Sequence, residues 1–226
     1  MDASIATTHG TRFLVNHGVR DEELELFLAA DCAPDIVGIN HYLTSERYLD
    51  ETTERYPAWS HGGNHRHRYA DVEAVRVDLP AEDLGPKSRL SEAWERYRRP
   101  IAVTEAHHGS TRDEQVRWLI EVWSAAEDLR AGGQDIRAVT VWSLFGAIDW
   151  NSRLLRKSGF YEPGAFDIRG PGPRRTAVGT AAGSLAKTGA FDHRFSTGMA
   201  GGDGTSATTI RRSRLAHRGA RSLGAS

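Results

Sequence analysis

The chain has 226 residues, 39% of them hydrophobic, which is enough for a soluble domain with a buried core. Its 29 basic and 30 acidic residues give a net charge of −1, and this balance argues against a nucleic-acid-binding protein. No stretch approaches the roughly 18 apolar residues of a membrane span, and the N-terminus lacks the apolar core of a signal peptide. Cys32 is the only cysteine, which excludes an intramolecular disulfide and a cysteine metal site. We therefore expect a cytoplasmic protein.

The first third of the chain predicts one helix, one strand and a long loop. Residues 1–19 form an N-terminal extension, and the acidic residues 21–23 begin a short helix that stops before Pro34. The apolar positions of this helix are Leu24, Phe27 and Leu28. Residues 36–40 then predict a short buried strand. Residues 43–87 are rich in His, Arg and Tyr and predict an irregular, loop-like stretch.

A second helix and a second strand follow this loop. Ser88 can cap a helix that Pro100 ends. Its apolar side consists of Leu90, Ala93, Trp94 and Tyr97. Residues 101–104 predict a buried strand that closes on Glu105.

The third helix has the clearest signals in the sequence. Thr111 and Glu114 form a capping box, and Gly132 and Gly133 end the helix. Its apolar face consists of Val116, Leu119, Ile120, Trp123 and Ala126. A third buried strand over 138–142 and a weak helix around 176–187 follow.

Three continuous apolar strands separated by helices predict parallel βαβ units and an α/β fold. In such folds the chemistry gathers at the carboxyl ends of the strands. Those ends carry Asn40 and Tyr42, then Glu105, then Trp142. Aromatic rings stack on sugars, and carboxylates and amides bind pairs of hydroxyl groups, so these residue types favour a carbohydrate site. Asn and Glu also occur at strand ends as structural hydrogen-bonding residues.

Three segments carry a resemblance to family 1 glycoside hydrolases, the β-glucosidase family. Residues 35–42, Asp-Ile-Val-Gly-Ile-Asn-His-Tyr, resemble the sixth-strand signature of that family. Residues 100–105 are similar to its seventh strand, and residues 142–150 to its eighth. The resemblance implies the last three βα units of a (β/α)8 TIM barrel over 20–190.

The resemblance also implies roles for individual residues. Glu105 falls on the catalytic nucleophile of a retaining glycosidase, and Tyr42 on the tyrosine that hydrogen-bonds it. We expect the remaining sugar contacts from Asn40, His41, His107, Trp142, Asp149 and Trp150. The expected ligand is a glycoside, with no cofactor and no resident metal.

The acid/base motif of the family, Asn-Glu-Pro, is absent from the sequence. The only Glu-Pro pair is Glu162-Pro163, which follows the eighth-strand motif. We therefore expect this chain to hydrolyse glycosides weakly or not at all. The alternative is a non-catalytic carbohydrate-binding or regulatory module beside a reductase similar to dTDP-4-dehydrorhamnose reductase. A third hypothesis is a chain without function, which an exposed barrel edge would make prone to aggregation.

Several histidines and tryptophans admit more than one interpretation. His61, His65 and His67 could bind a metal, but the interleaved arginines disfavour a cation, and we expect a flexible rim of a sugar cleft. His107 and His108 could contact substrate or replace part of the acid/base machinery, or could be loop residues satisfied by solvent. Trp94, Trp118 and Trp123 sit on predicted helices, and core packing is the better interpretation because Trp94 and Trp123 share faces with aliphatic residues.

The C-terminal tail differs in composition from the rest of the chain. Residues 196–226 hold five arginines and one acid, a charge of 5 − 1 = +4, and no aromatic residue. We expect a disordered basic tail over 191–226. The abrupt change near residue 195 is typical of a truncated or frame-shifted chain, and the expected partners are a missing N-terminal barrel half or a fused reductase domain.

Overall fold

The computed structural model describes residues 9–29, 32–152 and 154–192, so most of the expected tail over 191–226 lies outside the described residues. The chain divides into two compact units, Met1–Ile36 and Val37–Ser226. The first unit holds helix α1 (His9–Asn16), which the sequence did not predict, and helix α2 (Asp21–Ala29). Of the expected apolar side of α2, Leu24 is buried but Phe27 is 68% exposed.

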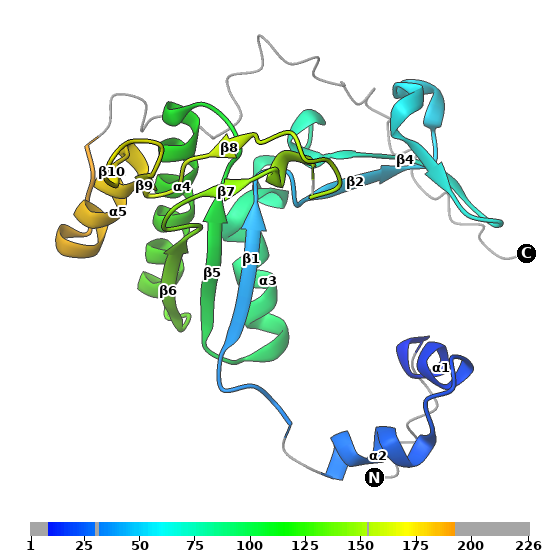
Figure 1. Ribbon diagram of the computed structural model, residues 1–226. Helices are drawn as coiled ribbons and strands as arrows, with labels where there is room; N and C mark the ends of the chain where they lie inside the picture. The colour runs from blue at the N-terminus through cyan, green and yellow to red at the C-terminus, as the bar shows by residue number, and fades with distance from the viewer. Residues whose placement is uncertain (1–8, 30–31, 153, 193–226) are drawn as a thin grey trace, which may run out of the picture. The chain divides into compact units, whose positions relative to one another are not determined.

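The second unit is built on a parallel sheet of three strands, as predicted (Figure 1). Strand β1 (Val37–Tyr42) pairs with β5 (Ile101–His107), and β5 pairs with β6 (Ile136–Val141). Helix α3 (Gly85–Tyr97) ends the long connection from β1 to β5, and helix α4 (Arg112–Ala131) joins β5 to β6. Both helices lie behind the sheet in the view of Figure 1.

The main core lies between the sheet and helices α3, α4 and α5. Trp118 is 1% exposed, and Trp94 and Trp123 pack against the same core, which agrees with the core-packing prediction. The largest fully buried aliphatic members are Leu90, Ile101, Val103, Val116, Val122 and Ile136.

Helices α3 and α4 are capped differently at their N-termini. In α4 the Thr111 hydroxyl accepts a hydrogen bond from the backbone of Glu114, 3.4 Å away, which confirms the predicted cap. The prediction of Ser88 as the cap of α3 is wrong, because that helix already begins at Gly85. The Gly85 N–H donates to the Glu46 carboxylate, 2.8 Å away, and Pro86 is preorganised for the first helical turn.

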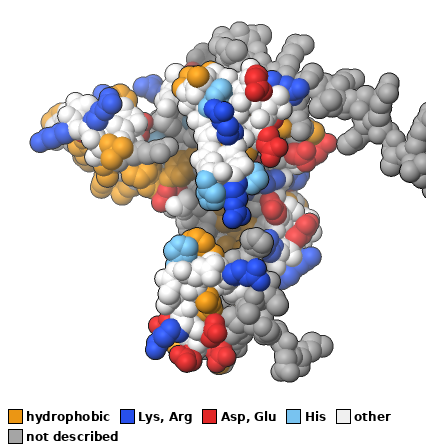
Figure 2. Space-filling model, turned by 90° about the vertical axis from the view of Figure 1, so that its right-hand side faces the viewer, with side chains coloured by type: hydrophobic (Ala, Val, Ile, Leu, Met, Phe, Trp, Pro, Cys, Tyr) orange, Lys and Arg blue, Asp and Glu red, His pale blue; other side chains and the backbone are white. Residues whose placement is uncertain are grey.

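The prediction of an irregular stretch over 43–87 is also wrong. Strands β2 (Arg47–Asp50), β4 (Arg68–Glu73) and β3 (His61–Gly63) form an antiparallel sheet in the order β2-β4-β3. The small core of this sheet consists of Tyr56, Ala70, Val72 and Val77. Figure 1 shows the sheet extending away from β1, and Figure 2 shows histidine and basic side chains gathered on this side of the molecule.

Short 3₁₀ helices interrupt the same stretch and recur after β7. They are Thr53–Arg55, Ala58–Ser60, Ala74–Arg76, Ala81–Asp83 and Trp150–Ser152.

The C-terminal part adds two short hairpins and one helix. Strand β7 (Ala147–Ile148) pairs with β8 (Tyr161–Glu162), and β9 (Phe166–Asp167) pairs with β10 (Arg174–Arg175). Helix α5 (Ala177–Thr188) confirms the weak helix predicted around 176–187. Its buried residues Val178, Ala181 and Leu185 belong to the main core. Among the described residues, no helix combines the length and apolar character that crossing a bilayer requires.

Candidate functional site

Tyr42 and Glu105 meet at the carboxyl ends of β1 and β5. The Tyr42 hydroxyl donates a hydrogen bond to Oε2 of Glu105. Burial, together with the hydrogen bond to Glu105 and the charge of Glu105, raises the pKa of Tyr42 well above its ordinary value. The tyrosine therefore stays protonated, and its hydroxyl remains a hydrogen-bond donor to the carboxylate. The structure thus brings together the two residues that the sequence selected as nucleophile and partner.

A one-residue bulge in β5 places Glu105 on this face of the sheet. Val103 pairs with Ile39 of β1, but the next pair joins Glu105 to Asn40, so β5 contains one extra residue. The register of β5 against β6 shifts in the same place. Val103 and Ala106 both lie in the main core. Because side chains alternate along a strand, a regular strand would turn Glu105 toward the core, and the bulge turns it away.

Asn40 lies beside Glu105 in the register and is exposed. Its side-chain oxygen accepts a hydrogen bond of 2.6 Å from the hydroxyl of Thr104. That bond leaves the amide NH₂ group of Asn40 as the donor for a ligand.

The structure does not bring His41 to this face. His41 is 5% exposed, and its ring lies 5.4 Å from the ring of Trp118 on the core side of β1. The alternation of side chains along the strand separates it from Asn40 and Tyr42. It lines another cleft, of about 360 Å³, together with Glu46 and Arg89. Burial is the main cause that lowers the pKa of His41.

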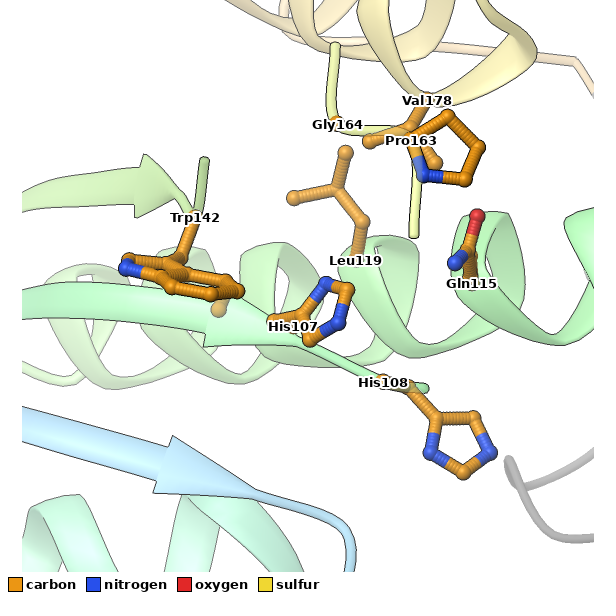
Figure 3. A pocket seen from close by; sticks show the side chains of 9 residues that line it. His107, His108, Gln115, Leu119, Trp142, Pro163, Gly164 and Val178 are labelled. Atoms are coloured by element: carbon orange, nitrogen blue, oxygen red, sulfur yellow. The ribbon is translucent and has the colours of Figure 1, made fainter. Parts of the chain in front are cut away.

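Three aromatic rings extend the site from β5 toward β7. The ring of His107 lies 5.1 Å from that of Trp142, which lies 5.3 Å from that of Trp150. Figure 3 shows His107 beside Trp142, whereas His108 lies farther along the chain and points away from Trp142. Trp150 is 43% exposed, so one aromatic ring of the group remains open to solvent.

Asp149 lies in this region, but its carboxylate is already engaged. Oδ1 accepts hydrogen bonds from the hydroxyl of Ser158, at 2.6 Å, and from the backbone of Phe160, at 2.9 Å. Oδ2 accepts from the backbone of Ser158 at 3.1 Å. These bonds lower the pKa of Asp149, that from the Ser158 side chain most. Asp149 therefore holds the segment that leads to β8, and sugar binding by this residue stays a prediction.

An open cleft of about 670 Å³ lies over the strand ends. Its lining includes Tyr42, His107, His108, Trp150 and Glu162. The sequence did not predict Glu162 as a site residue, because Glu162-Pro163 follows the eighth-strand motif. This Glu-Pro pair is the one sequence signal that could have selected it. The strand pairing of β8 with β7 returns Glu162 to the cleft.

The histidines at 61, 65 and 67 do not gather into a metal site. A ring nitrogen of His61 donates to the carbonyl oxygens of Thr53 and Tyr56, at 2.8 and 3.0 Å. Within the described ranges, no group of three or more His, Cys, Asp or Glu side chains is placed to hold a metal ion.

No protein-family profile matches the sequence, and no curated protein matches it. Solved structures do match. A β-glucosidase from Thermotoga maritima in complex with noeuromycin has 15% identity and a TM-score of 0.55, over 82% of this chain and 42% of that chain. Its complex with castanospermine has 14% identity over the same shares, also with a TM-score of 0.55. Virulence factor SghA from Agrobacterium tumefaciens has 18% identity and a TM-score of 0.50, over 74% and 37%.

These matches establish the fold at a coarse level. The described part of the chain has a β-glycosidase-like α/β fold that corresponds to part of a TIM barrel, as the sequence predicted. The chain spans less than half the length of each matched structure. Because the identities are below 20%, these matches support the fold alone. Any activity must be argued from the residues of the site.

Proposed function

We propose that the chain carries the nucleophile side of a family 1-type glycoside hydrolase site, which cleaves O-glycosidic bonds with retention. The observation that carries the proposal is the hydrogen bond from Tyr42 to Glu105, at the carboxyl ends of adjacent parallel strands. In a barrel of this fold, those ends hold the active site. The proposed ligand is a carbohydrate, and the matched β-glucosidases make β-glucosides the first substrates to try.

In the proposed reaction, a carboxylate oxygen of Glu105 attacks the anomeric carbon as the glycosidic C–O bond breaks. The leaving oxygen departs with the bonding electrons, and the proton that it takes up is balanced by the one that water releases in the second step. Water then hydrolyses the bond between the sugar and Glu105, which releases the free carboxylate and a sugar of unchanged anomeric configuration. Tyr42 orients the carboxylate through its hydrogen bond. Asn40 and the rings of Trp142 and Trp150 would hold the sugar, the first through its amide and the others by stacking.

The test is covalent trapping of the glycosyl-enzyme. An activated aryl β-glucoside that carries fluorine next to the anomeric carbon forms the intermediate and slows its hydrolysis. We expect intact-protein mass spectrometry to detect one added sugar, and peptide mapping to assign it to Glu105. Glu105→Gln should abolish labelling, while Glu127→Gln, a change on the exposed side of α4, should retain it. Labelling elsewhere, or an unlabelled wild type, contradicts the proposal.

A second candidate is a carbohydrate-binding module without turnover, beside a sugar-nucleotide reductase. The exposed Asn40 and Trp150 favour it, because they suit binding without chemistry. Titration calorimetry with oligosaccharides separates the two candidates. Binding that Trp150→Ala abolishes and Glu105→Gln leaves intact, with no glycosyl-enzyme, supports the module.

A further inference from the structure

Glu162 is held in the cleft by its own backbone. Strand β8 places it opposite Ala147 of β7. Gly146 lies directly against this strand, because a Cβ there would collide with the carbonyl oxygen of Glu162, and its φ is 84°. A residue with a side chain would therefore push β8 away or strain the turn. The glycine gives β8 room to approach β7 and carry Glu162 toward β5.

The carboxyl group of Glu162 faces His107. Its Oε2 lies 3.7 Å from Nε2 of His107, with side chains 12% and 9% exposed. Both atoms are buried, and neither has a hydrogen-bond partner among the described residues. Burying two polar atoms without hydrogen-bond partners costs free energy of folding, unless a shared proton or a bridging water molecule connects them. The opposite oxygen, Oε1, lies beside Gly109, where a Cβ would come within 2.9 Å of it.

The protonation states of the two groups are complementary. Burial raises the pKa of Glu162, against a lowering by the charge of His108. Burial also lowers the pKa of His107, against the raising effects of a hydrogen bond to the Trp142 backbone and of Glu105. Burial therefore favours the uncharged form of both groups, a protonated carboxyl and a neutral imidazole.

His107 also connects Glu162 to the nucleophile side. Its ring lies 6.4 Å from that of Tyr42, the partner of Glu105. Tyr42, His107, His108 and Glu162 line one cleft. Glu162 therefore shares a cleft with Tyr42, the hydrogen-bond partner of Glu105. In glycosidases the acid/base carboxyl and the nucleophile lie in different environments, which suits one carboxyl in this cleft and the other beside Tyr42.

Resting on the proposed function, we propose that Glu162, paired with His107, is the proton donor and acceptor of this site. As Glu105 attacks the anomeric carbon, the leaving oxygen takes the proton of Glu162 and departs as an alcohol. In the second step the Glu162 carboxylate removes a proton from water, whose oxygen bonds to the anomeric carbon as the ester bond to Glu105 breaks. Each residue returns to its starting state, so no other reactant is needed.

The proposal is tested by comparing leaving groups. A strongly acidic aryl leaving group needs no proton, whereas a simple alkyl leaving group does. We expect Glu162→Gln to form the glycosyl-enzyme from the activated aryl glucoside at nearly the wild-type rate. With the alkyl glucoside, kcat/KM should fall about 10²–10⁴-fold, the range of general acid catalysis. Glu127→Gln should change neither rate.

Two further variants keep the test decisive. Gly109→Ala retains Glu162 but would bring a Cβ within 2.9 Å of Oε1, so the carboxyl must shift. This variant should reproduce the leaving-group pattern with a smaller effect. Glu162→Ala removes the base of the second step, and azide, which reacts without base, should restore turnover and yield a glycosyl azide. Equal loss on both leaving groups, without azide rescue, would mean that Glu162 only supports the structure and would overturn the inference.

The outcomes separate this inference from the proposed function. If wild type forms no glycosyl-enzyme, the proposed function fails and the inference with it. If the glycosyl-enzyme forms but Glu162→Gln does not distinguish the leaving groups, only the inference fails. Carbon-13 NMR of labelled glutamate gives a readout without substrate. We expect the signal that Glu162→Gln removes to titrate above the ordinary range of a glutamate, and titration within that range contradicts the inference.

Discussion

The carboxylate of Asp149 accepts a hydrogen bond of 2.6 Å from the hydroxyl of Ser158, nine residues along the chain. Asp149 has a φ of 57°, a conformation that asparagine also tolerates. We expect Asp149→Asn to keep the backbone but turn an NH₂ group toward N–H donors. The melting temperature should therefore fall, and proteolysis should begin between residues 149 and 160. Asp78→Asn, an exposed change, is the control.

The same bonds give this effect a pH dependence. They lower the folded-state pKa of Asp149 below its unfolded value, so their stabilisation is present above the unfolded pKa and is lost as the pH falls through the folded one. The difference between wild type and Asp149→Asn should therefore shrink in acid. Equal melting temperatures of the two proteins at neutral pH would contradict the role of Asp149 in this segment.

The titration of Tyr42 depends on Glu105. Burial and Glu105 both raise the pKa of Tyr42. We expect Glu105→Gln to lower that pKa, since the charge disappears, but to leave it above the ordinary tyrosine value because burial remains. Carbon-13 NMR of labelled tyrosine measures it, and Tyr42→Phe assigns the signal. An unchanged titration in Glu105→Gln would mean that the hydrogen bond is absent in solution.

His41 makes stability sensitive to mild acid. Burial lowers its pKa in the folded state, so below the unfolded value of 6.5 the unfolded chain binds a proton that the folded chain resists. We expect the free energy of unfolding to fall as the pH decreases from about 7.5 to about 5. His41→Phe keeps a ring against Trp118 and should flatten this dependence. His65→Phe, an exposed change, should leave the slope unchanged.

The main core determines stability more than the exposed apolar residues do. Leu90 is 1% exposed, whereas Leu155 is 83% exposed. Leu90→Ala should lower the free energy of unfolding by about 2–5 kcal/mol, through lost burial and a cavity. Leu155→Ala should change it by no more than about 0.5 kcal/mol. Denaturant titration of both variants measures the difference, and equal losses would contradict the assignment of the core.

The sequence predicted the parallel sheet because its strands are continuous apolar runs between helices. Residues 101–104 could be assigned without tertiary information, and so could the cap at Thr111. The hydrogen bond between Tyr42 and Glu105 followed from motif resemblance together with the rule that parallel strand ends meet. At these positions the local sequence pattern and the three-dimensional structure agree.

Other features depend on contacts that no local pattern encodes. Strand β4 has only two buried residues, Ala70 and Val72, among polar neighbours, so its apolar signal is too short to detect. His41 is an exception: the motif match assigned it to the site together with Asn40 and Tyr42, whereas the alternation of side chains along β1 turns it toward the core. Glu162 joins the cleft only through the pairing of β8 with β7, which brings together segments that no spacing rule relates.

The bulge in β5 has a consequence for local opening of the sheet. The residues around Thr104 and Glu105 lie where the ladder shifts register against both neighbouring strands, whereas the shift between Ile101 and Ala102 is against β6 alone. The backbone at 104 and 105 is therefore less completely paired than that at 101 and 103. Amide hydrogens at 104 and 105 should exchange with deuterium before those at 101 and 103. The carboxylate proposed as nucleophile thus belongs to the part of β5 whose backbone we expect to open first. A ligand that bridges β1 and β5 should slow the exchange of these amide hydrogens.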